Sequence, residues 1–86
     1  MDLSSAVITE HCREQLAARG LDEQAVRAVL RSPEQVLEVR AGRVVAQSTD
    51  SIAGYLLRVF VDIDRSPFEV VTAYRTSKIE KYRSRP

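Results

Sequence analysis

The fold is decided by two runs, GYLLRVFVDID at residues 54–64 and FEVVTAYRTSK at residues 68–78. Both runs are rich in β-branched and aromatic residues, which favour strands. The polar residues between them, Asp64-Arg65-Ser66-Pro67, are typical of a hairpin turn. The two runs therefore predict a pair of long antiparallel strands, and the polar residues within them are the first candidates for function.

Two helices are expected ahead of this hairpin. Thr9 fits an N-cap and Gly20 a stop for a helix over residues 10–19. A second helix begins after Asp22 and closes before Ser32-Pro33, because the residue before a proline avoids helical geometry. The apolar stripes expected to be buried are Ile8, Cys12 and Leu16 on the first helix and Val26, Val29 and Leu30 on the second.

A first hairpin and a C-terminal helix complete the expected elements. Apolar and polar residues alternate over residues 36–48, with a turn at Ala41-Gly42, which predicts two further strands. Residues 49–54 are small and polar and predict a flexible loop. A capping box with Ser77 as N-cap predicts a short basic helix that runs through Arg83.

These elements predict an α+β fold in one domain over residues 1–86. Two N-terminal helices pack on one face of a four-stranded antiparallel sheet, and a short basic helix ends the chain. A chain of 86 residues holds one modest core, so function is expected on a surface or in a shallow cleft. Cys12 is the single cysteine, so neither an internal disulfide nor a cysteine metal cluster is expected, and no cofactor is predicted.

The composition also bears on where the protein works. The N-terminus lacks the basic start and apolar run of a signal peptide, and no segment is long enough to span a membrane. We therefore expect a cytoplasmic protein without membrane contact. The net charge is +1, but residues 1–74 carry −3 and residues 75–86 carry +4. The positive C-terminal end is suited to phosphate, although a solvated helix face has the same composition.

Alternation of side chains assigns the third strand to two faces. Residues 55, 57, 59, 61 and 63 form the apolar face and are expected in the core. The opposite face carries Arg58 beside Phe60. Because an unpaired guanidinium is costly to bury, Arg58 is expected either to pair with Asp62 on the same face or to bind an anion.

The register of the last strand stays open between two alternatives. With a tight turn, Tyr74 joins the core side. With a turn one residue longer, Val61 faces Val71 and Tyr74 lies beside Arg58 on the open face, together with Thr72. We favour the longer turn, because it buries Val71 and Ala73 and keeps Glu69 from facing Asp62, a like-charge pair.

In this order of elements, the chain resembles the RelE/ParE-like superfamily of small bacterial toxins. The runs at residues 55–59 and 70–78, with Tyr82, look like the arginine-bearing strand, the following strand and the basic C-terminal segment of that family. BrnT-type members are particularly similar. The pattern at residues 11–21, with Pro33-Glu34, also looks like a domain-of-unknown-function family that is often labelled RelE-like.

The resemblance implies a metal-free endoribonuclease of a bacterial toxin–antitoxin system, with RNA as substrate and a cognate antitoxin as partner. Such cleavage needs a proton removed from the 2′-hydroxyl, a neutralised phosphate and a protonated leaving oxygen, which Arg, Lys, Tyr and His can supply. The resemblance implies phosphate-binding cations at Arg58 and at Arg75 or Lys78, and a tyrosine near the scissile phosphate at Tyr82 or Tyr74. The candidate catalytic residues are therefore Arg58, Tyr74, Tyr82 and His11, and the candidate RNA- or phosphate-binding residues are Arg75, Lys78 and Lys81. His11 lies on the first helix and would have to reach across an edge of the sheet; the alternative is a place on the helix surface.

The alternative is a non-catalytic module that binds a protein or forms a homodimer. ParE-like relatives are similar in fold but act by binding a topoisomerase. On this reading Phe60 and Tyr74 anchor a partner on the same face. A metal or thiol enzyme is the least favoured class, because His11 and Cys12 stand next to each other on one helix and cannot furnish a site.

Overall fold

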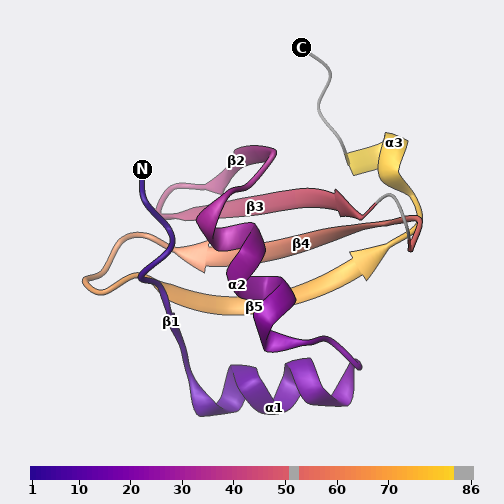
Figure 1. The fold of residues 1–86 in the computed structure, drawn as a ribbon. Helices are drawn as coiled ribbons and strands as arrows, with labels where there is room; N and C mark the ends of the chain where they lie inside the picture. The colour runs from indigo at the N-terminus through magenta and orange to yellow at the C-terminus, as the bar shows by residue number, and fades with distance from the viewer. Residues whose placement is uncertain (51–52, 83–86) are drawn as a thin grey trace.

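A five-stranded mixed sheet carries three helices in the computed structural model, which describes residues 1–50 and 53–82 (Figure 1). The predicted α+β class is therefore confirmed. The elements in order are β1 (Val7–Ile8), α1 (Glu10–Ala18), α2 (Glu23–Arg31), β2 (Gln35–Arg40), β3 (Arg43–Asp50), β4 (Tyr55–Asp62), β5 (Glu69–Thr76) and α3 (Ile79–Tyr82).

The sheet has five strands in the order β1-β5-β4-β3-β2, which corrects the prediction of four antiparallel strands. The two predicted hairpins are antiparallel, but Val7 and Ile8 add a short strand parallel to β5. The amide of Val7 donates to the carbonyl of Phe68 over 2.8 Å, and the Ile8 side chain is buried. Two residues are too few to show a strand periodicity, so the sequence analysis did not identify them as a strand and placed them just before α1.

The two long helices form as their caps predict. Thr9 Oγ1 accepts from the amide of Cys12 over 3.2 Å, and Asp22 accepts from the amide of Gln24 over 2.9 Å. Gly20 adopts a φ of 68° and ends α1 in a Schellman arrangement, where its amide donates to the carbonyl of Ala17. No helix within residues 1–50 and 53–82 is long and apolar enough to cross a bilayer.

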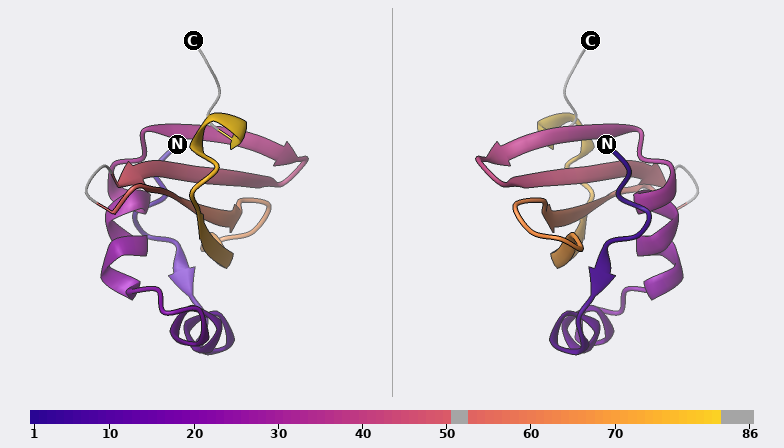
Figure 2. Two further views of the ribbon diagram at one scale, coloured as in Figure 1. Left: turned by 90° about the vertical axis from the view of Figure 1, so that its right-hand side faces the viewer. Right: turned by 90° about the vertical axis from the view of Figure 1, so that its left-hand side faces the viewer.

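The core lies between the helices and one face of the sheet, with α2 crossing that face (Figures 1 and 2). The apolar face predicted for β4 is the core face, because Leu57, Val59 and Val61 are buried there. The residues predicted for the helix stripes also lie in this cluster, which contains Ile8, Cys12, Leu16, Val26, Val29 and Leu30, although Ile8 belongs to β1 and not to α1. The opposite face of the sheet carries α3 at one end and none of the longer helices.

Two boundaries differ from the prediction. The expected loop over residues 49–54 begins later, because β3 continues to Asp50, which pairs with Tyr55; residues 51–52 lie outside the described residues. At the start of α3 the side-chain acceptor is Thr76 rather than Ser77, since Thr76 Oγ1 accepts from the amide of Lys78 over 3.1 Å. The predicted continuation of that helix to Arg83 also lies outside the described residues.

The register of β5 combines parts of both alternatives through a β-bulge. Arg58 pairs with Tyr74, as the longer turn predicted, but Val61 pairs with Val70 instead of Val71. Val71 is the extra residue of the bulge and is only half-buried, so the prediction that it would be buried is wrong. Ala73 is buried as expected.

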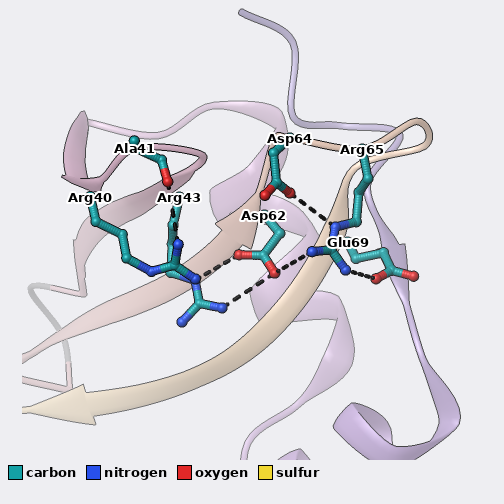
Figure 3. Close-up of polar contacts among 7 residues, drawn as sticks. All are labelled: Arg40, Ala41, Arg43, Asp62, Asp64, Arg65 and Glu69. Carbon is teal, nitrogen blue, oxygen red and sulfur yellow. Dashed lines mark hydrogen bonds and ion pairs between the residues drawn. The ribbon is translucent and has the colours of Figure 1, made fainter.

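The register also places Asp62 opposite Glu69, the like-charge pair that the sequence analysis expected to be avoided. Two arginines neutralise the pair (Figure 3). Arg43 Nε donates to Asp62 over 2.6 Å, while Arg65 lies 3.3 Å from Asp62 and 3.0 Å from Glu69. The hydrogen bond from Arg43 lowers the pKa of the Asp62 carboxyl below its usual value. The network joins the turn of the first hairpin to that of the second.

Asp62→Asn should lower the free energy of unfolding by about 2 kcal/mol at neutral pH, because Arg43 and Arg65 lose a charged acceptor. In a chain of this size, that loss lowers Tm by roughly 8–16 °C. A lowered folded-state pKa stabilises the protein above the unfolded-state pKa, and this contribution is lost as pH falls through the folded-state pKa. Thermal unfolding from pH 7 to pH 3 should therefore show the two proteins converging at acid pH.

The matched control is Asp64→Asn, which changes an exposed carboxylate of the same network. This variant should leave Tm nearly unchanged, because exposed ion pairs contribute little. An equal effect of both variants, or a difference independent of pH, would contradict the role given to Asp62.

Candidate functional site

Arg58 lies near the middle of the sheet, on the face opposite α1 and α2. Its neighbours across the strands are Gln47 on β3 and Tyr74 on β5. Arg58 Nε donates to Gln47 Oε1 over 2.9 Å, and Arg58 Nη1 donates to the Tyr74 hydroxyl over 2.7 Å. The guanidinium is therefore held from both sides and is half-buried.

Three aromatic rings surround this guanidinium. Arg58 Cζ lies 4.4 Å from the ring centroid of Tyr82, 5.4 Å from that of Phe60 and 5.8 Å from that of Tyr74. Phe60 stacks on Tyr74 with centroids 5.9 Å apart, and Tyr82 meets Tyr74 edge-on. A cation near aromatic faces is stabilised by the ring quadrupoles. The Arg58 site is defined as Arg58, Gln47, Phe60, Tyr74 and Tyr82.

Gln47 links the strands of this site to α3. Its side chain is 1 % exposed, and Nε2 donates both to Gln35 Oε1 over 2.9 Å and to the carbonyl of Tyr82 over 3.0 Å. The sequence analysis did not identify Gln47. The available signal was a polar residue inside a strand with another strand on each side, where its amide needs buried partners.

Neutral groups, rather than a carboxylate, bind Arg58. Among residues 1–50 and 53–82, the ion pairs involve Arg13, Arg43 and Arg65, but not Arg58. The predicted pairing of Arg58 with Asp62 is wrong, because Asp62 is taken by Arg43. Arg58 therefore has no carboxylate partner among the described residues, and the second expectation, that it binds an anion, stays a prediction.

Two of the predicted phosphate-binding residues, Lys78 and Lys81, belong to the region of α3. Lys81 lies in α3, and Lys78 is the residue just before it. Lys78 and Lys81 are exposed, and Lys81 Nζ lies 5.3 Å from the ring centroid of Tyr82. They line a cleft of about 620 Å³ between α3 and the end of β3, formed by Thr49, Ser77, Lys78, Ile79, Glu80 and Lys81. The cleft carries two lysines and one carboxylate, Glu80, and Lys81 connects it to the Arg58 site through the Tyr82 ring.

Two other predicted site residues lie elsewhere. Arg75 pairs with Leu57 and so belongs to the helix-covered face, where its Cζ lies 5.6 Å from the ring centroid of Tyr55. His11 is exposed on α1 and contacts Gln15 at 3.3 Å on the same helix. The structure thus brings together Arg58, Tyr74, Tyr82 and Lys81, and it places Lys78 in the cleft that Lys81 also lines. Arg75 and His11 lie elsewhere.

Cys12, the single cysteine, is buried in the core, and burial raises the pKa of its thiol. Within residues 1–50 and 53–82, no group of three or more His, Cys, Asp or Glu side chains is arranged to hold a metal ion.

A family model described as "Domain of unknown function (DUF4258)" matches residues 8–75, more than half of the chain. The matched range includes Arg58, Gln47 and Tyr74 and ends before α3. No curated protein and no solved structure matches the chain. The family description states no activity, so the resemblance to RelE/ParE-like toxins stays a prediction.

Gln47→Leu should release α3 from the sheet, because the Tyr82 carbonyl and Arg58 Nε lose a buried partner. We expect a fall in the free energy of unfolding of about 1–3 kcal/mol and faster tryptic cleavage after Lys78 and Lys81. Limited proteolysis followed by mass spectrometry measures the cleavage, and thermal unfolding measures the stability.

Thr49→Val is the control for this measurement. Thr49 Oγ1 is buried, and among the described residues it has no hydrogen-bond partner. Replacing it with an isosteric methyl should leave the stability equal or higher and the cleavage rate unchanged. If Gln47→Leu were cleaved no faster than Thr49→Val, Gln47 would not hold α3.

Proposed function

We propose that this chain, which belongs to the DUF4258 family, is a toxin-like, metal-free endoribonuclease that acts at the Arg58 site. The observation that carries the proposal is the 2.7 Å bond between Arg58 and the Tyr74 hydroxyl on the sheet face away from α1 and α2. This bond joins Arg58 to Tyr74. Arg58 has no carboxylate partner in the described part of the chain, and the Tyr74 hydroxyl is a group that can transfer a proton.

In this proposal Arg58 holds the scissile phosphate. The hydrogen bonds that Arg58 makes to other described residues start from Nε and Nη1, which leaves the donors of Nη2 for a phosphate oxygen. The rings of Phe60 and Tyr82 flank the guanidinium and offer surfaces on which a base can stack. Lys78 and Lys81 attract the polyanion toward the site.

The two tyrosines supply the proton transfers. The Tyr74 hydroxyl beside Arg58 accepts the proton of the 2′-hydroxyl and gives its own proton to water while the O2′–P bond forms. The P–O5′ bond breaks, and the Tyr82 hydroxyl gives its proton to O5′. The products are a 2′,3′-cyclic phosphate and a 5′-hydroxyl, and exchange with water restores Tyr82.

This function accompanies a RelE/ParE-like fold and a cognate antitoxin as partner. The two helices on one sheet face and the arginine-bearing central strand support that reading of the fold. An antitoxin that covers the Arg58 site would block the phosphate position. Stoichiometric inhibition by the product of the neighbouring gene would identify such a partner.

A second candidate is a non-catalytic module that binds a protein through the same face. The stacked pair of Phe60 and Tyr74 favours it, because aromatic side chains on a face that carries only the short helix α3 are typical anchors of a partner. Under this alternative, Phe60→Ala weakens partner binding, whereas no variant changes RNA.

Arg58→Gln and Tyr74→Phe should each lower the rate of RNA cleavage by about 100-fold or more, since each removes a group that acts in the transition state. The measurement follows end-labelled single-stranded RNA in EDTA on a denaturing gel, together with growth arrest on induced expression. Arg31→Gln, an exposed arginine at the end of α2, is the matched control and should behave as wild type. Intact RNA and normal growth with the folded wild type would exclude the proposal.

A further inference from the structure

Arg19, at the end of α1, is fixed against the open edge of β5. The short strand β1 pairs only with Glu69 and Val70, so the rest of β5 forms an outer edge of the sheet. Arg19 Nη1 donates to Thr72 Oγ1 over 2.6 Å and to the carbonyl of Ala73 over 2.8 Å. The side chain is nevertheless exposed, so an oriented cation meets the solvent at this edge.

This edge borders the Arg58 site. Thr72 pairs with Phe60, and Tyr74 pairs with Arg58 two residues farther along β5. Because a strand rises about 3.3 Å per residue, the Thr72 and Tyr74 positions on that face are about 7 Å apart. Thr72, which anchors the Arg19 guanidinium, thus lies two residues along β5 from Tyr74, whose hydroxyl contacts Arg58.

Arg75 reaches the same edge from the other face. Its side chain lies beside Gly20, the residue that follows Arg19. A Cβ atom added to Gly20 would stand 3.6 Å from Arg75 Nη2. Arg75 is also exposed. Arg19 and Arg75 are named the edge cations, and among residues 1–50 and 53–82 neither forms an ion pair with a carboxylate.

We infer that the edge cations form a second phosphate-binding position, which holds a phosphate of single-stranded RNA next to the one held by Arg58. The inference rests on the proposed function and deepens it, because it makes the substrate a strand of several nucleotides that leaves the Arg58 site over the edge of β5. The bonds to Thr72 and Ala73 orient the Arg19 guanidinium before RNA arrives, which lowers the entropy cost of binding. The edge position also brings Arg75 back into RNA binding, at a place the sequence did not suggest.

The test uses the full chain and 2′-O-methyl oligonucleotides, which lack the reacting hydroxyl and are not cleaved. A fluorescent ten-nucleotide strand is titrated at several KCl concentrations, and a dinucleoside monophosphate with one phosphate is titrated by NMR. Arg19→Gln should weaken ten-nucleotide binding about 3- to 10-fold at low salt and reduce the slope of log K against log[KCl] by about 0.7. It should leave dinucleoside monophosphate binding unchanged.

Three further variants keep the result interpretable. Arg19→Lys retains the charge and should keep the salt slope. Arg31→Gln should match wild type for both ligands. Arg75→Gln should repeat the effect of Arg19→Gln, and it decides the question if Arg19→Gln fails to fold.

The outcomes separate the inference from the proposed function. If Arg58→Gln abolishes binding while the edge variants behave as Arg31→Gln, the inference is wrong and the proposed function stands. Equal weakening of both ligands by Arg19→Gln would mean that Arg19 only supports the sheet edge, and would also overturn the inference. If the wild type binds neither ligand, both proposals fail.

Discussion

One extra residue in β5 sets the arrangement on both faces of the sheet. The bulge at Val71 lets Val70 and Ala73 both point into the core, although they are three residues apart. Without it, strict alternation would send either Val70 or Ala73 to the opposite face. The same bulge aligns Tyr74 with Arg58 at one end of β5 and leaves Glu69 facing a second carboxylate at the other. The polar site and the charge network of the hairpin turns therefore follow from a single register.

The arginines divide according to what holds them. Arg43 and Arg65 form ion pairs with carboxylates and connect the turns of the two hairpins, so their charges are neutralised within the fold. Arg58 and Arg19 are held by hydroxyl, amide and carbonyl groups, which orient a guanidinium without neutralising it. A net charge of +1 conceals this division. The distribution of partners, rather than the number of cations, separates a candidate binding surface from a structural one.

Local patterns predicted what local interactions determine. The caps at Thr9 and Asp22, the buried helix stripes and the apolar face of β4 were read correctly, because each depends on neighbours a few residues away. The bulge, β1 and the buried amide of Gln47 depend on partners far along the chain and leave no periodic signature. Arg75 is an exception: with Tyr74 placed beside Arg58, alternation alone sends the next residue to the other face. The placement of Arg75 on the helix-covered face could therefore have been predicted from the favoured register.

The contact between Tyr82 and Arg58 couples α3 to the Arg58 site. Tyr82 covers the guanidinium from α3, and its own carbonyl is held by Gln47. Any ligand that takes the place of this ring must also undo the docking of α3, whereas a ligand that stacks against the ring reinforces it. By thermodynamic reciprocity, loosening α3 favours the first kind of ligand by the same factor by which that ligand loosens α3. Docked α3 thus weakens the binding of a ligand that displaces the Tyr82 ring and strengthens the binding of a ligand that stacks against it.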